Sequence, residues 1–453
     1  MAVGRLAVLG CVLLCTALFV SASVLDVVFE WKEVDFAYPS GAARQEAIRN
    51  RMFVPGNNVP VGLEVWNNKL FVTVPRWKTG VPASLAYVYL NETGNKSPRL
   101  IPYPNWDSHN IFLDIIPRFG QDNRNVTRIV SPFRMRADAC DRLWVLDTGK
   151  ADILGNEEQI GPNQLLVYNL NNDELVLRYE IPSHFMKNGS FLANIAVDVK
   201  ASSCSNAFAY LADLGTSSMV VYSMLENKAW RVTHPYFQVD PNAINYRVAG
   251  ISFQWEDGLF GLALSSEQED GFRMLYFHPF SSFNEYSVST KVLRNESLWK
   301  DAQPLGESRD EFKLLGSRGS DTQSCASFLD EKTGILFYAQ VTRNAVGCWN
   351  SRHTYNPATQ GEVAVDNVTM VFPNDIKVDA QRNLWVLTDR MPLFTHNVMN
   401  YSDFNFRVLT APVDKAVAHT VCARETSNAG CSYTPLGFAL VLLISCICQK
   451  FLL

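Results

Sequence analysis

The sequence predicts an all-β chain folded as a six-bladed β-propeller around a central channel. The first observation behind this prediction is an internal repeat: residues 137–147 read ADACDRLWVLD, and residues 378–388 read VDAQRNLWVLT. Each copy is an apolar strand that ends in Asp, then a polar turn, then a second strand that contains Trp144 or Trp385. A strand–turn–strand unit cannot bury both of its faces alone, so its repetition indicates stacked units with these tryptophans at equivalent positions.

The second observation is that looser copies of the hairpin bring the series to six in chain order. These copies span residues 61–74, 195–213, 250–263 and 324–339. Their spacing of roughly 50 to 75 residues leaves room for four strands in each unit, and no helical period interrupts the series. Six hairpins therefore predict six blades, and the first strand of each hairpin is expected to face the channel.

The N-terminal segment predicts a signal peptide over residues 1–23. Arg5 supplies the positive charge, residues 6–20 are apolar, and small residues follow at 21–23. Seven N-x-S/T sequons agree with export, so we expect a glycosylated extracellular protein whose propeller domain spans residues 24–426. The sequon asparagines are Asn91, Asn95, Asn125, Asn188, Asn295, Asn367 and Asn400.

The C-terminal segment, residues 427–453, is an apolar tail preceded by small residues. This order is the outline of a signal for a GPI lipid anchor, which would attach the protein to the outer cell surface. A transmembrane helix is the second alternative, although the apolar stretch 436–448 is shorter than the ~20 residues that span a bilayer. A tail without a role is the third, and all three alternatives stay open.

Composition and motifs exclude several classes of function. The net charge of −5 is spread without long blocks, which argues against a nucleic-acid partner. The chain contains no P-loop, no G-x-S-x-G elbow, no H-E-x-x-H and no G-x-G-x-x-G, and its seven histidines are scattered. We therefore expect no cofactor, and no metal site.

Ten cysteines are present, and six of them remain after the signal peptide and the apolar tail are set aside. These are Cys140, Cys204, Cys325, Cys348, Cys422 and Cys431. None has the spacing of metal ligands, so disulfides are the default in an oxidising compartment. Their connectivity is not deducible from the sequence. Positions in neighbouring turns allow a bridge from Cys140 to Cys204, and Cys422 is placed to hold the end of the domain to Cys348.

With these residues in view, the chain closely resembles the yellow / major royal jelly protein family of insects. The resemblance runs from about residue 31 to residue 422. Its most specific segments are LFVTVPRW at 70–77, LIPYP at 100–104, RLWVLDTG at 142–149, NIAVD at 194–198, NAVGCWN at 344–350 and LTDRMP at 387–392.

The resemblance implies a six-bladed propeller and the disulfides Cys140–Cys204 and Cys348–Cys422. Many members have one more disulfide near the positions of Asp114 and Gly161, which are not cysteines here. Cys325 and Cys431 therefore have no family partner. Cys325 is expected to be a buried thiol, because its strand is predicted to be central in a blade.

The function that the resemblance implies is less uniform than the fold. Some members are needed for cuticle pigmentation, some are reported to convert dopachrome-type melanin intermediates, salivary relatives bind biogenic amines, and royal jelly members are nutritive. We expect a protein that binds small aromatic amines or catechol-derived melanin precursors and acts in cuticle pigmentation. The alternatives are a dopachrome-type isomerase and a structural or storage protein without a ligand.

The candidate ligand site is one mouth of the channel, where the first residues of the inner strands converge. Polar residues at or near those strand starts are expected to surround the ligand, and an aromatic side chain close by is expected to stack on it. The residues are Asn194, Ser324, Asn344, Asn374, Asp375 and Phe372. Asp375 is expected to pair with an ammonium group. For an isomerase, the candidate acid or base is Asp375, Asp389 or His184.

Overall fold

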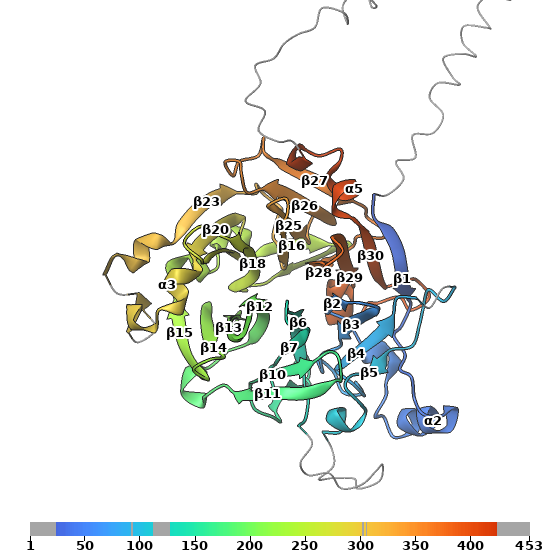
Figure 1. The fold of residues 1–453 in the computed structure, drawn as a ribbon. Coiled ribbons are helices and arrows are strands. Elements are labelled where there is room, and N and C mark those ends of the chain that lie inside the picture. Colours follow the sequence, from blue (N-terminus) through green and yellow to red (C-terminus); the bar gives the residue numbers. More distant parts are fainter. Residues whose placement is uncertain (1–23, 92–93, 112–126, 301–302, 305, 424–453) are drawn as a thin grey trace, which may run out of the picture.

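Six four-stranded sheets are arranged as blades around a channel (Figure 1). The computed structural model describes residues 24–91, 94–111, 127–300, 303–304 and 306–423. In every blade the strand that comes first in the repeat lies nearest the axis, and each of these inner strands contacts the inner strands of the neighbouring blades. The predicted six-bladed propeller is confirmed.

The blades follow one another along the chain. Blade 1 contains β2 (Gly62–Trp66), β3 (Lys69–Thr73), β4 (Leu85–Tyr89) and β5 (Ile101–Pro102). Blade 2 contains β6 (Pro132–Ala137), β7 (Arg142–Asp147), β10 (Gln164–Asn169) and β11 (Glu174–Glu180). Blade 3 contains β12 (Leu192–Lys200), β13 (Ser203–Asp213), β14 (Ser218–Ser223) and β15 (Lys228–Thr233).

The second half of the ring repeats this pattern. Blade 4 contains β18 (Leu259–Glu267), β19 (Arg273–Pro279), β20 (Asn284–Ser289) and β23 (Lys313–Ser317). Blade 5 contains β24 (Ser327–Asp330), β25 (Ile335–Gln340), β26 (Ala345–Asn350) and β27 (Gln360–Val365). Blade 6 contains β28 (Pro373–Val378), β29 (Asn383–Thr388), β30 (Phe406–Pro412) and β1 (Asp26–Trp31).

Blade 6 is completed by the N-terminal strand of the domain. β1 pairs antiparallel with β30, so the outermost strand of the last blade comes from the start of the chain. Figure 1 shows the two strands side by side, β1 in blue and β30 in red. This pairing closes the ring, because it ties the first described segment to the last strand of the sixth sheet. The hairpin repeat alone did not predict it.

Short elements connect the blades. The helices are α2 (Gly41–Arg49), α3 (Thr290–Arg294), α4 (Met391–Thr395) and α5 (Val413–Val417). The 3-10 helices are η1 (Pro55–Asn57), η2 (Asp107–His109), η3 (Ser183–Phe185), η4 (Pro235–Phe237), η5 (Pro241–Ala243), η6 (Glu296–Leu298), η7 (Gly306–Glu311) and η8 (Val421–Ala423). Small two-stranded sheets pair β8 (Lys150–Ala151) with β9 (Glu158–Gln159), β16 (Asn245–Val248) with β17 (Ile251–Gln254), and β21 (Trp299–Lys300) with β22 (Gln303–Pro304).

One of the predicted hairpins is wrong. The first strand of the predicted hairpin 250–263 was expected to face the channel as the inner strand of blade 4, but residues 251–254 do not do so. They form β17 instead, which pairs with β16 in a separate hairpin, and β18 is the inner strand. The error arose because two strand-like apolar segments follow one another here, and a periodic pattern indicates a strand without identifying its partner.

The second strands of the repeat are buried on both faces. All six residues of β7 are buried, and so are five of the six residues of β29. Trp144 and Trp385 occupy the same position in these strands and expose 0% and 6% of their surface. Such strands read as continuous apolar runs because each sheet packs between two neighbouring blades. The prediction that the two tryptophans are equivalent is confirmed.

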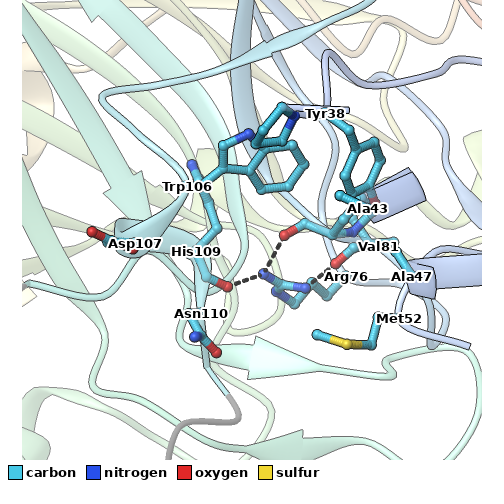
Figure 2. Close-up of a pocket in the computed structure, with 12 residues that line it drawn as sticks. Tyr38, Ala43, Ala47, Met52, Arg76, Val81, Trp106, Asp107, His109 and Asn110 are labelled. Atoms are coloured by element: carbon cyan, nitrogen blue, oxygen red, sulfur yellow. Dashed lines mark hydrogen bonds between the residues drawn. The ribbon is translucent and has the colours of Figure 1, made fainter. Parts of the chain in front are cut away.

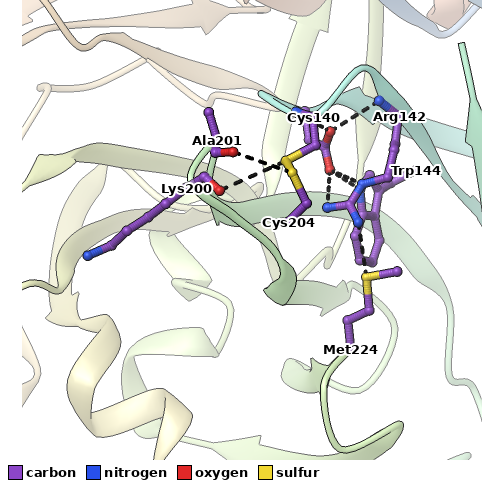
Figure 3. Close-up of a disulfide and its surroundings, with 8 residues drawn as sticks. Cys140, Arg142, Trp144, Lys200, Ala201, Cys204 and Met224 are labelled. Atoms are coloured by element: carbon purple, nitrogen blue, oxygen red, sulfur yellow. Dashed lines mark hydrogen bonds and ion pairs between the residues drawn. A yellow bond between two sulfur atoms is a disulfide. The ribbon is translucent and has the colours of Figure 1, made fainter. Parts of the chain in front are cut away.

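Two disulfides hold neighbouring segments together. Cys140, in the turn before β7, is bonded to Cys204 of β13, so this bridge links blades 2 and 3 (Figure 3). Cys348 of β26 is bonded to Cys422 of η8, which fastens the end of the domain to blade 5. Both pairs are those that the family resemblance implies. Cys325 is a free buried thiol, as expected, and Cys431 lies outside the described residues.

Several predictions concern surface sites and chain ends. The six sequon asparagines within the described residues are all exposed, whereas Asn125 lies outside them, as do the predicted signal peptide and the apolar tail. Glycosylation, export and lipid attachment therefore stay predictions. No helix in the part of the chain that the structure describes is long and apolar enough to cross a membrane.

Candidate functional site

A cavity of about 390 Å³ lies at the mouth of the channel where the inner strands begin. Most of its lining is apolar, and the polar exceptions are Arg134, Asp257, Asn374, Thr395 and His396. The apolar residues are Val61, Trp77, Phe133, Ile153, Leu154, Phe191, Leu214, Gly215, Trp255, Phe260, Phe280 and Met391. We call this space the mouth cavity.

Aromatic rings from several blades form the wall of the mouth cavity. The Phe260 and Phe280 rings of blade 4 are stacked, with centroids 5.7 Å apart. Phe133 of blade 2 packs edge-on against Phe191 at 4.7 Å. Trp255 packs 5.8 Å from Phe280. The rings converge because the segments that lead into the inner strands all end near the axis, so the cavity offers flat apolar surfaces to a planar ligand.

Asp257 is the acidic group of the mouth cavity. It follows the inserted β16–β17 hairpin, and its backbone is held to Ser281 by hydrogen bonds of 3.2 Å from Asp257 N and 3.0 Å to Asp257 O. Its carboxylate makes no hydrogen bond or ion pair with any described residue. Burial raises the pKa of this carboxyl to about 6. A partly buried carboxyl without a partner among the described residues is ready to accept a proton or to pair with a cation.

Gly258 fixes the position of Asp257 relative to blade 3. Its N–H donates to the carbonyl of Leu214, and an added Cβ would lie 2.1 Å from Ser217 Oγ and 3.0 Å from Ser217 Cα. The chain therefore passes so close to blade 3 that a larger residue at position 258 would force one of the two segments to move.

Arg134 forms the floor of the mouth cavity. Its Nη2 donates to the main-chain and side-chain oxygens of Asn374, both at 2.8 Å, and its Nη1 donates to the carbonyl of Val61. The guanidinium also lies 5.2 Å from the centre of the Phe260 ring. Because one side chain from blade 2 contacts blades 1, 4 and 6, Arg134 holds the strand starts together around the axis.

Asp389, one of the predicted acid–base candidates, lies behind this floor. It accepts hydrogen bonds from the side chain of Asn374 and from the backbone N–H of Met391 at 3.0 Å. Its side chain is fully buried, and this burial raises the pKa of the carboxyl to about 7. Asp389 therefore supports Asn374 and does not itself line the mouth cavity.

Two further side chains bring polar atoms to the mouth cavity. The indole Nε1 of Trp77 is buried and has no hydrogen-bond partner among the residues that the structure describes. His396 is exposed, and its Nδ1 donates to the carbonyl of Pro392 at 2.9 Å. A buried indole N–H is a donor that a ligand oxygen can satisfy.

The predicted ligand residues are spread over more than one layer. Asn374 lines the mouth cavity, whereas Asp375 and Asn194 line a separate cavity further along the channel. The carboxylate of Asp375 already binds Lys377 Nζ at 2.7 Å and the backbone N–H of Leu63 at 2.9 Å. Hydrogen bonds thus already occupy the oxygens of Asp375, whereas the carboxylate of Asp257 has no such partner among the described residues, and the expected pairing of Asp375 with an ammonium group stays a prediction.

Ser324, Phe372 and Asn344 are not at the inner surface of the mouth. Ser324 is fully buried and its hydroxyl donates to the carbonyl of Ala326. Phe372 is buried behind the wall, with its ring 6.0 Å from that of Trp255. Asn344 lies in the turn between β25 and β26, where its side-chain oxygen accepts from the backbone N–H of Phe372 at 3.3 Å. These residues support the wall from outside.

His184, the third acid–base candidate, is exposed on η3, and its ring packs 4.2 Å from that of Phe185. The sequence analysis missed Asp257, which lies inside the predicted hairpin 250–263. An Asp followed by Gly is typical of turns, so no local signal separates this residue from the other turn aspartates. Only the aromatic residues on either side of it, Trp255 and Phe260, hinted at its environment.

Another cavity, of about 210 Å³, lies between α2 and the segment that carries His109 (Figure 2). Arg76 lies in it, and its Nη2 donates to the carbonyl of His109 at 2.9 Å. Burial, and then the charge of Arg76, lower the pKa of His109 to about 3. The His109 ring is engaged on both sides, by Tyr103 O at 2.8 Å and by Ser84 N at 3.3 Å. These bonds give both polar groups a structural role.

The described residues contain no cluster of three or more His, Cys, Asp or Glu side chains that could hold a metal ion. The groups that line the mouth cavity are mostly aromatic and aliphatic side chains, with one carboxyl and a few hydrogen-bond donors.

Comparison with known proteins places the chain in a family. A family model described as major royal jelly protein matches residues 130–422. A Drosophila melanogaster protein named dopaminechrome tautomerase is 38% identical over 411 residues, which are 90% of this chain and 86% of the relative. Protein yellow of Drosophila melanogaster is 39% identical over 396 residues, covering 87% of this chain and 70% of the relative. The chain therefore belongs to the yellow / major royal jelly protein family.

Proposed function

We propose that this protein binds small catechol-derived aromatic amines, melanin precursors among them, in the mouth cavity, and that it acts in cuticle pigmentation. The observation that carries the proposal is the carboxylate of Asp257, which has no partner among the described residues and lies in a cavity walled by aromatic rings. Support also comes from the family, since several relatives are named protein yellow and one is named dopaminechrome tautomerase.

In the proposed complex the ammonium group of the ligand pairs with Asp257. The ligand ring lies against the Phe260–Phe280 stack, and the Trp77 N–H donates to a ring oxygen. A hydrogen bond to a charged group inside a cavity contributes about 1.5–3 kcal/mol. Cation–π contact with the nearby rings adds to this attraction. Both terms select an aromatic ligand that carries a positive charge.

A second candidate function is tautomerisation of an aminochrome, an indoline quinone formed from a catecholamine. In this reaction a proton leaves the saturated ring carbon and a proton arrives at a quinone oxygen, so no oxidant or reductant is needed. The raised pKa of Asp257, about 6, favours this candidate because a general base works best near the pH at which it operates. The Trp77 N–H would stabilise the oxygen that gains negative charge.

Two experiments on the purified protein distinguish the two candidate functions. Calorimetry with dopamine and serotonin tests binding, and loss of the visible absorbance of dopachrome or dopaminechrome, beside a heat-denatured sample, tests turnover. Binding without turnover supports a carrier. Turnover that exceeds the denatured control supports a tautomerase. If the protein shows neither binding nor turnover, both candidates are wrong, and a structural or storage protein is favoured.

The Asp257→Asn variant tests whether the binding or the turnover takes place in the mouth cavity. Asparagine has nearly the same shape but carries no negative charge and does not act as a base at neutral pH. Glu269→Gln is the matched control, because Glu269 is exposed in the loop after β18, at the end of blade 4 opposite to the mouth. An unchanged Asp257→Asn variant would place the site elsewhere.

We also propose that the protein is exported and held at the outer cell surface by a lipid anchor. The two disulfides support export, because such bonds persist in oxidising compartments. Expression in insect cells followed by a phosphatidylinositol-specific phospholipase tests the anchor. Release into the medium is the expected result. Retention on the cells after treatment, or secretion without it, would contradict the anchor.

A further inference from the structure

A second cavity, of about 520 Å³, lies in the channel beyond the floor formed by Arg134. We call it the channel cavity. It is lined by the later parts of the inner strands and by the turns that follow them, and it shares no lining residue with the mouth cavity. Its walls include Leu262, Leu264 and Phe328, and its polar side chains include Arg136, Asn194, Ser327, Asp375 and Lys377.

Three side chains in and beside the channel cavity, those of Asp375, Glu64 and Asn194, have acceptor oxygens that are already occupied. Asp375 accepts from two backbone N–H groups and from Lys377 Nζ, and it lies 3.6 Å from Arg134 Nε. The carboxylate of Glu64 is paired with Arg136, and it also accepts hydrogen bonds from the backbone N–H groups of Val65 at 3.0 Å and Ala137 at 3.1 Å. The side-chain oxygen of Asn194 accepts from Ile195 N at 2.8 Å.

Hydrogen-bond donors, in contrast, are left over. Arg136 contacts Glu64 through Nη1 alone, so its Nε and Nη2 have no hydrogen bond within the described residues. Lys377 Nζ binds Asp375 at 2.7 Å and the Ile376 carbonyl at only 3.4 Å, which leaves donor capacity. The hydroxyl of Ser327 is buried and has no partner in the described part of the chain. A ligand for these groups must supply acceptors.

The charges of the channel also favour an anion. Arg134, Arg136 and Lys377 share two carboxylates, those of Glu64 and Asp375. The other charged groups of the lining are paired: Lys200 binds Glu267 at 2.8 Å, Arg273 binds Glu331 at 2.9 Å, and Asp138 binds Arg142, which lies outside the lining, at 2.7 Å. Excess positive charge in a confined, partly apolar space attracts a single negative charge.

The position of Arg136 suits recognition of a carboxylate. Its guanidinium lies over the Phe328 ring, with Cζ 4.5 Å from the ring centre, and Glu64 holds it from one side. The side chain is therefore fixed before a ligand arrives, and a planar guanidinium presents two N–H groups to a carboxylate at once. The apolar residues Leu262 and Leu264 offer a surface for an organic group.

We propose that the channel cavity binds a small organic acid. Its carboxylate accepts hydrogen bonds from Arg136, Lys377 and Ser327, and its apolar body lies against the walls that contain Leu262 and Leu264. This site is independent of the mouth cavity and does not rest on the function proposed there.

Calorimetry with three probes tests the chemistry of the ligand. Benzoate carries both the carboxylate and an apolar body, benzyl alcohol keeps the body without the charge, and chloride keeps the charge without the body. We expect benzoate to bind and the other two to bind at least about tenfold more weakly. Equal affinity for benzoate and benzyl alcohol, or no binding of benzoate at all, would overturn the proposal.

Substitutions test whether benzoate binds in the channel cavity. Ser327→Ala should weaken benzoate binding by about fivefold or more while Tm stays unchanged, because the hydroxyl has no partner to lose in the free protein. Arg136→Gln should weaken it by at least about tenfold. Arg99→Gln, which removes one exposed positive charge elsewhere, is the matched control, and its affinity should not change.

The mouth variant Asp257→Asn should bind benzoate as the parent protein does. A loss in that variant would assign benzoate to the mouth cavity and contradict the proposal. Full affinity in Ser327→Ala would contradict it as well, even if Arg136→Gln fails to fold.

Discussion

The indole nitrogen of Trp144 donates a 2.7 Å hydrogen bond to the carboxylate of Asp138. Trp385 makes the same bond, also of 2.7 Å, to Asp379. In both hairpins the other carboxylate oxygen accepts from the backbone N–H of the first residue after the turn, Arg142 N at 3.1 Å and Asn383 N at 2.8 Å. The repeat therefore produces the same hydrogen-bond arrangement twice. In each copy a single Asp closes the turn and also accepts a hydrogen bond from the indole N–H of the Trp in the next strand.

Trp144→Phe and Trp385→Phe should each destabilise the protein by about 1–3 kcal/mol, because each variant removes a buried hydrogen bond to a charged group while keeping a large ring. Thermal denaturation measures the loss as a fall in Tm. Phe260→Leu, which makes a buried aromatic side chain smaller without removing a hydrogen bond, is the comparison for reduced packing. Unchanged Tm values for both tryptophan variants would show that the bond contributes nothing.

Amine binding should weaken as pH falls through the pKa of Asp257. The free carboxyl has a pKa of about 6, so below that pH a proton competes with the ammonium ligand for the same carboxylate. Between about pH 7.5 and about pH 5 the affinity for dopamine should fall by roughly tenfold. Calorimetry at both values measures it. Asp257→Asn should bind weakly at both pH values, and Glu269→Gln should keep the parent profile.

Asp389→Asn should change how stability depends on pH. Burial raises the pKa of Asp389 from its usual value near 3.8 to about 7, so the folded state holds its proton more tightly than the unfolded chain does. This contribution is present below about pH 4 and is lost as pH rises through about 7. Relative to the parent protein, the variant should gain stability as pH rises over that range. A constant difference in Tm from pH 4 to 8 would show that Asp389 does not titrate there.

Asp375→Asn should destabilise the protein by about 3–5 kcal/mol, because it removes the partner of a buried charge. Lys377 would lose its 2.7 Å ion pair, and Arg134 its 3.6 Å contact. Denaturant unfolding measures the effect. If Asp375→Asn instead keeps its stability and loses only amine affinity, Asp375 and not Asp257 is the residue that pairs with the ligand.

Removing the disulfide between Cys140 and Cys204 should cost about 4 kcal/mol by the chain-entropy estimate, because the bridge spans 64 residues. The double substitution of both cysteines to Ala, compared with the parent protein in denaturant unfolding, measures it. Peptide mapping without reduction checks the pairing directly. Recovery of Cys325 joined to either bridge would contradict the connectivity, because Cys325 is a buried free thiol in the structure.

The sequence by itself determined the number and order of the blades. Hairpin signals are local: an apolar strand, a turn and a second strand lie within about a dozen residues, and their repetition implies stacking. The same locality explains the error in blade 4, where β17 and β18 carry similar patterns and only their partners differ. It also explains why the pairing of β1 with β30 stayed hidden, since no pattern links two strands at opposite ends of the domain.

Only the tertiary structure decided which carboxyl is available to a ligand. Asp375 is at the predicted place, yet the N–H of Leu63, 312 residues away in the sequence, already occupies one of its oxygens. Asp257 reads as an ordinary turn residue and ends in an aromatic cavity without a partner. The physical reason is that desolvation and hydrogen-bond satisfaction depend on groups brought together from different blades, whereas a sequence pattern reports only on neighbours along the chain.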